Sequence, residues 1–60
     1  MTANEKILIV DDDPALRQLV ANTLQQEGYL AITASDGQEG LRQLYQAHPD
    51  LIVLDVIMPT

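Results

Sequence analysis

Short apolar runs alternate with helical patterns along this sequence. Residues 7–10 (ILIV) and 51–54 (LIVL) are continuous runs of Leu, Ile and Val, and an aspartate follows each run directly. Runs of this length without alternation are typical of strands that are covered on both faces, as in a parallel sheet. Residues 29–34 alternate and are less apolar, which predicts a strand at the edge of the sheet.

Two segments between these runs have the spacing of amphipathic helices. The first begins at Asp13 and Pro14, a capping residue followed by a proline in the first turn, and ends at Gly28. The second begins with capping residues at 35–36 and ends before Pro49. The apolar positions recur at helical spacing in both segments, as Leu16, Leu19, Val20 and Leu24, and as Leu41, Leu44 and Tyr45.

The order strand, helix, strand, helix, strand is completed within 60 residues. Such alternation predicts βαβ units with right-handed crossovers and a parallel sheet. Because the first and third strands have the most buried patterns, we expect the strand order 2-1-3. A reversal of direction along the sheet then places the two helices on opposite faces.

Composition excludes several classes of function. Nine acidic residues against three basic residues give a net charge of −6, so neither a nucleic acid nor an anionic membrane is an expected partner. The apolar runs are too short for a signal peptide or a membrane span, which predicts a cytoplasmic protein. Cysteine is absent, so a chain this small is expected to need a partner surface for stability.

Aspartates at the ends of two predicted neighbouring strands are the candidate chemical groups. Asp11 and Asp12 follow the first strand, and Asp55 follows the third. Ligands of parallel sheets bind at the carboxyl ends of the strands, where the strand order reverses. Converging carboxylates repel one another, and a cation with a preference for oxygen ligands, such as Mg²⁺, relieves that repulsion. An aspartate beside Mg²⁺ can accept a phosphoryl group.

Other chemistries match the sequence poorly. The glycine-rich loops of dinucleotide-binding and P-loop proteins are absent, and the single histidine has no catalytic triad around it. Aspartate-based phosphatases also carry acidic residues after a first strand, and Asp11 and Asp13 have the required spacing. However, Pro14 next to Asp13 indicates the start of a helix instead.

The segments ILIVDDDPALRQLV, SDGQEGL and PDLIVLDVIMP together resemble the N-terminal half of the receiver domain of bacterial two-component response regulators. The resemblance extends over residues 6–59. It implies an α/β, flavodoxin-like (CheY-like) half domain, with residues 1–60 as a truncated receiver that dimerisation completes. Gly40 stands where the family more often has alanine, and it is expected to weaken the second helix by roughly 0.5–1 kcal/mol.

The resemblance also implies a role for each site residue. Asp55 matches the phospho-acceptor, Asp12 a direct Mg²⁺ ligand, and Asp11 an acidic residue that acts through water. The backbone carbonyl of Ile57 matches a third protein ligand of the metal, and Pro59 matches the proline that shapes the following loop.

The implied function is that of a signalling module and not of an enzyme acting on external substrates. A sensor histidine kinase or a small phosphodonor is expected to phosphorylate Asp55, with Mg²⁺ as cofactor. The alternative is a half-receiver that dimerises or serves as a folding unit without phosphotransfer, because the sensing Ser or Thr and the Lys of the family are not within these residues. The third strand has an open edge, so we expect a homodimer.

Overall fold

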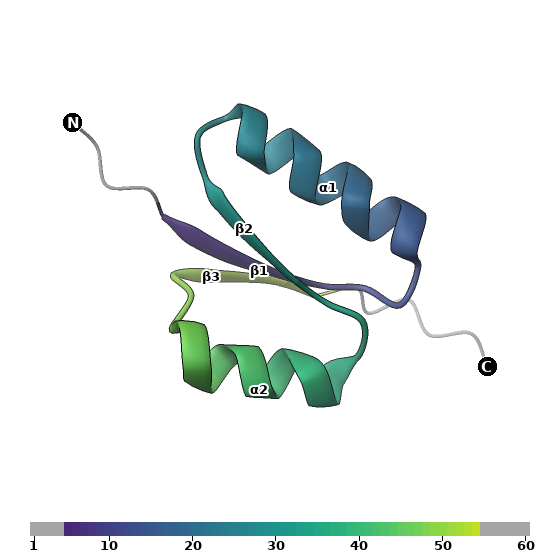
Figure 1. The fold of residues 1–60 in the computed structure, drawn as a ribbon, viewed down its shortest axis with the longest axis vertical. Coiled ribbons are helices and arrows are strands. Elements are labelled where there is room, and N and C mark those ends of the chain that lie inside the picture. The colour runs from purple at the N-terminus through teal and green to yellow at the C-terminus, as the bar shows by residue number, and fades with distance from the viewer. Residues whose placement is uncertain (1–4, 55–60) are drawn as a thin grey trace.

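The structure is a computed structural model, and it describes residues 5–54 of the chain (Figure 1). Every predicted element is present in the predicted order, with ends that differ from the expected ones by one or two residues. The elements are β1 (Lys6–Val10), α1 (Pro14–Gln26), β2 (Leu30–Ala34), α2 (Gly37–Ala47) and β3 (Leu51–Leu54). Within the described range, no helix is long and apolar enough to cross a membrane.

The sheet has three parallel strands in the order β2-β1-β3, which confirms the predicted arrangement. The central strand β1 pairs in register with both neighbours, so that Val10 lies level with Ala34 on β2 and with Leu54 on β3. All three strands therefore end at the same edge of the sheet. That edge is where a ligand site is expected in a parallel sheet.

Local chemistry explains where the helices begin and end. The Asp13 side chain accepts hydrogen bonds from the backbone N–H groups of the next turn, and Pro14 opens α1, as predicted. Asp36 caps α2 in the same way and accepts a 2.8 Å hydrogen bond from the Glu39 N–H. Gly28 follows α1 with φ of 97°, a left-handed conformation that glycine adopts without a steric penalty.

The two helices cover opposite faces of the sheet, as predicted (Figure 1). Successive side chains of β1 point to alternate faces, so β1 contributes to two separate core clusters. On the α1 face, the cluster is Ile7, Ile9 and Ala21, with Val20, Leu24 and Ala31 packed against it. On the α2 face, it is Leu8, Val10 and Ala34, with Ile32 and Leu44 packed against it.

The predicted apolar stripes of the helices are only partly correct. The smallest residues, Ala21 and Gly40, are the buried positions of α1 and α2, and neither belonged to the predicted stripes. Small side chains bring the helix backbone close to the sheet, so larger residues lie to the side. The apolar residues left exposed, with 44–72% of their surface accessible, are Leu16, Leu19, Leu41 and Tyr45.

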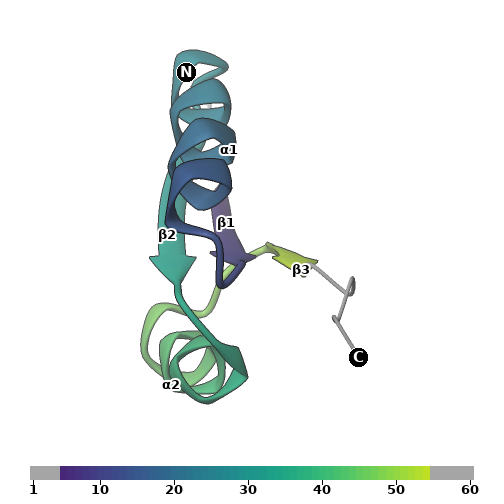
Figure 2. The same ribbon diagram turned by 90° about the vertical axis from the view of Figure 1, so that its right-hand side faces the viewer.

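The sequence pattern of β3 indicates a strand that is covered on both faces, but in this structure β3 is exposed. Each of its four residues has 39–57% of its surface accessible. Both helices contact β1 and β2, and neither contacts β3 within the described residues. Figure 2 shows β3 standing apart from the column formed by α1, β2 and α2. The open edge that we expected for the third strand is present in the described residues.

Gly40 has a packing role in addition to its effect on the helix. A Cβ atom at this position would lie 2.9 Å from Cγ2 of Val10, and a valine side chain has little freedom to move away. Replacing a helical glycine by alanine normally gains about 0.5–1 kcal/mol, but overpacking costs about 1–3 kcal/mol. We therefore expect Gly40→Ala to lower the free energy of unfolding by about 1 kcal/mol, measured by urea denaturation.

Gly37 provides the matched control for this substitution. It lies in the first turn of the same helix, and a Cβ atom there would meet no other atom within 4 Å. Gly37→Ala should therefore leave the protein at least as stable as it is now. If Gly40→Ala stabilised the protein as much as Gly37→Ala, the Val10 side chain would be able to move away from the added methyl group, and the predicted overpacking would be wrong.

Candidate functional site

The carboxyl edge of the sheet carries Asp11 and Asp12, which follow β1 directly. Val10 and Leu54 are paired at this edge, so β1 and β3 end side by side. Asp55 and Ile57, the other two predicted site residues, lie outside the described residues. The structure thus places two of the four predicted residues, and the positions of the other two stay predictions.

Asp11 is a buried carboxylate held by several hydrogen bonds. Only 6% of its surface is exposed, and its Oδ1 accepts a 2.9 Å hydrogen bond from the Asp13 N–H. Its own N–H donates to the Ala34 carbonyl at 3.2 Å, which extends the pairing of β1 with β2 by one residue. The backbone and one carboxylate oxygen of Asp11 are therefore fixed in position.

Arg17 also holds this loop, a role that the sequence analysis missed. Its Nη1 donates a 2.8 Å hydrogen bond to the backbone carbonyl of Asp11, and its side chain is partly buried. Arg17 lies one helical turn after the cap residue Asp13, and a basic residue at that distance from an acidic loop is the sequence signal that could have identified it.

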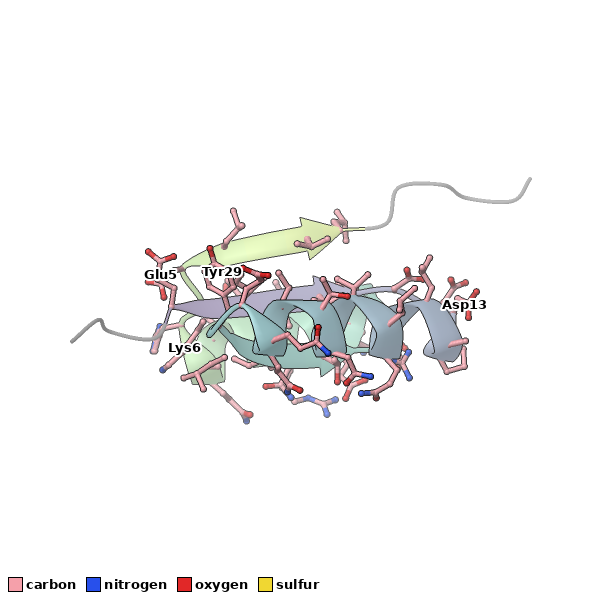
Figure 3. The ribbon with its side chains drawn as sticks, turned by 90° about the horizontal axis from the view of Figure 1, so that it is seen from above. Glu5, Lys6, Asp13 and Tyr29 are labelled. Carbon is pink, nitrogen blue, oxygen red and sulfur yellow. The ribbon has the colours of Figure 1, made fainter. Side chains whose placement is uncertain are left out.

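Asp12 and Asp13 differ from Asp11 because both are exposed. Asp13 is the helix cap, as predicted, and Figure 3 shows it at the opposite end of the molecule from Glu5, Lys6 and Tyr29. The Asp12 side chain has no such structural role within residues 5–54. Asp12 is thus an exposed carboxylate at this edge that caps no helix and is available to a ligand from solvent.

The donor chemistry at this edge suits a hard cation, but the described residues alone do not form a complete metal site. Asp11 and Asp12 supply only oxygen ligands, which Mg²⁺ prefers, and Mg²⁺ commonly keeps several water ligands beside one or two carboxylates. Among residues 5–54, no group of three or more acidic, histidine or cysteine side chains could hold a metal ion. A third acidic side chain at this edge would have to come from outside residues 5–54.

Asp50 fixes β3 beside β1 at the amino edge of the sheet. Its Oδ2 accepts a 2.8 Å hydrogen bond from the Lys6 N–H, and its own N–H donates to the Lys6 carbonyl at 2.8 Å. The Lys6 ammonium group in turn donates to the Ala47 carbonyl at the end of α2. Asp50 therefore helps to set the register on which the carboxyl edge depends.

Glu39 lies in the first turn of α2 and bonds to the residue before the helix cap. Its Oε1 accepts hydrogen bonds from the Ser35 N–H at 3.0 Å and from the Ser35 hydroxyl at 2.8 Å. The Ser35 N–H, followed by the hydroxyl, holds the pKa of Glu39 below its ordinary value. Asp36 and Glu39 have the spacing of a capping box, although the Glu39 side chain bonds to Ser35 and not to the N–H of the cap residue itself.

Comparisons with known proteins show what the chain is similar to. The family model described as "Response regulator receiver domain" matches residues 7–60. The alkaline phosphatase synthesis transcriptional regulatory protein PhoP of Bacillus subtilis (strain 168) is 50% identical over 56 residues, which are 93% of this chain and 23% of PhoP. The probable transcriptional regulator ycf27 of Guillardia theta is 42% identical over 59 residues, which are 98% of this chain and 23% of that protein.

A solved structure has a similar fold. The structure of the chemotaxis protein CheY4 of Vibrio cholerae superposes with a TM-score of 0.89 and 46% sequence identity, and the match covers 97% of this chain and 48% of the CheY4 chain. The chain therefore spans about a quarter of the length of these curated relatives and about half of CheY4.

Proposed function

Because the chain belongs to the response regulator receiver domain family, we propose that it is a phosphoryl-accepting module of a two-component signalling system, with Asp55 as the acceptor. The match to CheY4 and the strand order confirm the predicted flavodoxin-like (CheY-like) half domain. The proposal makes the chain a carrier of a phosphoryl group in the cytoplasm and not an enzyme for external substrates.

The observation that carries this proposal is the register between β1 and β3. Val10 pairs with Leu54, and each of these residues is followed in the sequence by an aspartate. Adjacent strands of a sheet lie about 4.8 Å apart. Asp11, Asp12 and Asp55 are thus attached to neighbouring strand ends, where carboxylates can act on one ligand.

The described aspartates have different parts in the proposed site. Asp12 is exposed and is proposed as a direct Mg²⁺ ligand, whereas the buried and hydrogen-bonded Asp11 is proposed to act through a water molecule. Asp55 and the backbone carbonyl of Ile57 are proposed as the remaining ligands. When bound, Mg²⁺ supplies positive charge that offsets the charge of the phosphoryl oxygens.

In the proposed reaction, Asp55 attacks the phosphorus atom of the donor. A bond forms between a carboxylate oxygen and phosphorus, and the bond between phosphorus and the donor atom breaks, with its electron pair leaving on the donor. The donor is proposed to be the phosphohistidine of a sensor kinase or a small molecule such as acetyl phosphate. The net charge of −6 disfavours nucleic acid and anionic lipid as partners of this segment.

A second candidate function is a structural or interaction unit without phosphotransfer. The exposed β3, with no helix over either face in the described residues, favours this candidate. It shares the family and the fold with the first candidate, so only a chemical experiment distinguishes them.

Incubation with acetyl phosphate and Mg²⁺, followed by mass spectrometry of the intact chain, tests the proposal. We expect one phosphoryl adduct on the wild-type chain. The adduct should not form when EDTA is added before the phosphodonor, and it should be absent from Asp55→Asn. Asp50→Asn is the matched control, because Asp50 lies at the opposite edge of the sheet and an asparagine there still accepts a hydrogen bond. The absence of an adduct from a folded sample, or an adduct that survives Asp55→Asn, would contradict the proposed acceptor.

A further inference from the structure

Arg17 reaches back from α1 to the loop that joins β1 to this helix. Its Nη1 donates a 2.8 Å hydrogen bond to the Asp11 carbonyl, and its backbone N–H donates to the Asp13 carbonyl at 2.9 Å. The Arg17 side chain is half-buried, whereas the neighbouring side chains of Leu16 and Gln18 are exposed. Arg17 therefore holds the loop at two carbonyls, one through its guanidinium group and one through its main chain.

The bond to the Asp11 carbonyl also constrains the backbone of Asp12. The Asp11 carbonyl and the Asp12 N–H belong to one peptide unit, which is planar and, as in the rest of the described chain, trans. A hydrogen bond that holds the carbonyl oxygen therefore also fixes the direction of the N–H and the position of the Asp12 Cα atom. The guanidinium group thus acts on the residue that follows the one to which it is bonded.

The peptide unit on the other side of Asp12 is held as well. The Asp13 N–H donates a 2.9 Å hydrogen bond to Oδ1 of Asp11, and the Asp11 N–H is in turn bonded to the Ala34 carbonyl on β2. The Asp12 side chain itself is exposed. The position of its carboxylate therefore depends on the two flanking peptide units, one held by Arg17 and the other by Asp11.

The Arg17 guanidinium group leaves the carboxylates of the site free. Within residues 5–54, it bonds to a neutral carbonyl oxygen and not to the carboxylate of Asp11 or Asp12. A guanidinium group that paired with either carboxylate would compete with a cation for the same oxygens. The charge of the guanidinium group still repels a cation nearby, so the two effects of Arg17 on cation binding have opposite signs.

We propose that Arg17 is a positioning residue of the cation site, which holds the peptide unit between Asp11 and Asp12 and thereby the Asp12 carboxylate in the orientation that binds Mg²⁺. The inference rests on the proposed function, because Asp12 is a Mg²⁺ ligand only by that proposal. Loss of a group that orients a metal ligand typically lowers metal affinity by about 10- to 100-fold. Arg17 takes no part in the transfer of the phosphoryl group.

Arg17→Met and Arg42→Met form a matched pair of variants. Each removes one positive charge from a chain whose net charge is −6 and keeps an unbranched side chain, but Arg42 is exposed on α2. In isothermal titration calorimetry, we expect Arg17→Met to weaken Mg²⁺ binding about tenfold and Arg42→Met to leave it close to the wild-type value. If Arg17 acted through its charge alone, Arg17→Met would strengthen Mg²⁺ binding instead.

The amide NMR spectrum of the Mg²⁺-free chain gives a readout that does not depend on the metal. The Asp12 amide signal should shift in Arg17→Met, because the carbonyl of the same peptide unit loses its hydrogen bond, and it should stay in place in Arg42→Met. Arg17→Gln, which is neutral and has its donor closer to the backbone, should behave like Arg17→Met, so the test survives if one of the two variants fails to fold. Arg17→Lys can still donate to the carbonyl and should restore part of the Mg²⁺ affinity.

A double variant tests whether Arg17 acts through Asp12. Once the Asp12 carboxylate is absent, its orientation no longer matters, so Arg17→Met should weaken Mg²⁺ binding much less in the Asp12→Ala background than in the wild-type chain. A general loss of structure would lower the affinity by the same factor in both backgrounds.

Four results would overturn the role of Arg17. They are unchanged or tighter Mg²⁺ binding in a folded Arg17→Met or Arg17→Gln chain, an Asp12 amide signal that does not move, an equal loss of affinity in Arg42→Met, and equal effects of Arg17→Met in the two backgrounds. A wild-type chain that binds Mg²⁺ but forms no phosphoryl adduct would contradict the proposed function alone, because the measurements on Arg17 need no phosphodonor. A wild-type chain that binds no Mg²⁺ would overturn both proposals.

Discussion

Leu8→Ala is expected to leave the chain largely unfolded at room temperature. Leu8 is in the middle of the central strand, and only 1% of its surface is exposed. Truncation of a fully buried leucine costs about 2–5 kcal/mol, whereas a domain of this size has a total stability of only about 3–5 kcal/mol from a single core. The loss is therefore comparable with the whole free energy of unfolding. Circular dichroism during urea denaturation measures the effect.

Ile52→Ala is the matched control, because Ile52 pairs with Leu8 at the same level of the sheet. Its side chain has 44% of its surface exposed, so its truncation removes less buried surface and should cost about 1 kcal/mol or less. Equal losses of stability for Leu8→Ala and Ile52→Ala would mean that β3 is covered in solution even in the monomer.

The elements and their order could be predicted from the sequence because their causes are local. The caps Asp13 and Asp36 define the starts of both helices through hydrogen bonds within one turn. The order β2-β1-β3 was expected because the first and third strands have the most apolar patterns, and it is correct although β3 is exposed within the described residues. Both inferences used only the pattern of residues along the chain, and both are correct.

The packing of the helices could not be predicted in the same way. The spacing of apolar residues indicated a stripe on each helix, but the buried residues of the helices are Ala21 and Gly40. The apolar stripe indicates which side of a helix faces the sheet. The distance between helix and sheet decides which residues of that side are fully buried. Much of each stripe is exposed within the described residues.

The candidate site shows a similar limit. Asp11 and Asp12 are adjacent and chemically identical in the sequence, yet one is buried and hydrogen-bonded and the other is exposed. Their difference arises because the chain turns from β1 into α1 at this point, and Asp11 bonds to the Asp13 N–H in that turn. The assignments of Asp55 and Ile57 depend on the sequence and on the register of β3, since both residues lie outside the described range.

Substitution of the two aspartates in turn should separate binding of the cation from stability of the fold. Asp12→Ala is expected to weaken Mg²⁺ binding at least about tenfold and to change the free energy of unfolding by no more than about 0.5 kcal/mol, because the side chain is exposed. Asp11→Ala should weaken Mg²⁺ binding and also lower the free energy of unfolding by about 1–3 kcal/mol, because the Asp13 N–H loses its acceptor.

Asp11→Asn distinguishes the two contributions of Asp11. An asparagine oxygen still accepts the hydrogen bond from the Asp13 N–H but brings no negative charge, so stability should return toward the wild-type value while Mg²⁺ binding stays weak. Isothermal titration calorimetry with Mg²⁺ and urea denaturation without it measure the two quantities separately. Wild-type Mg²⁺ affinity in Asp12→Ala would contradict the proposed role of Asp12, because no other exposed carboxylate follows β1 without also capping a helix.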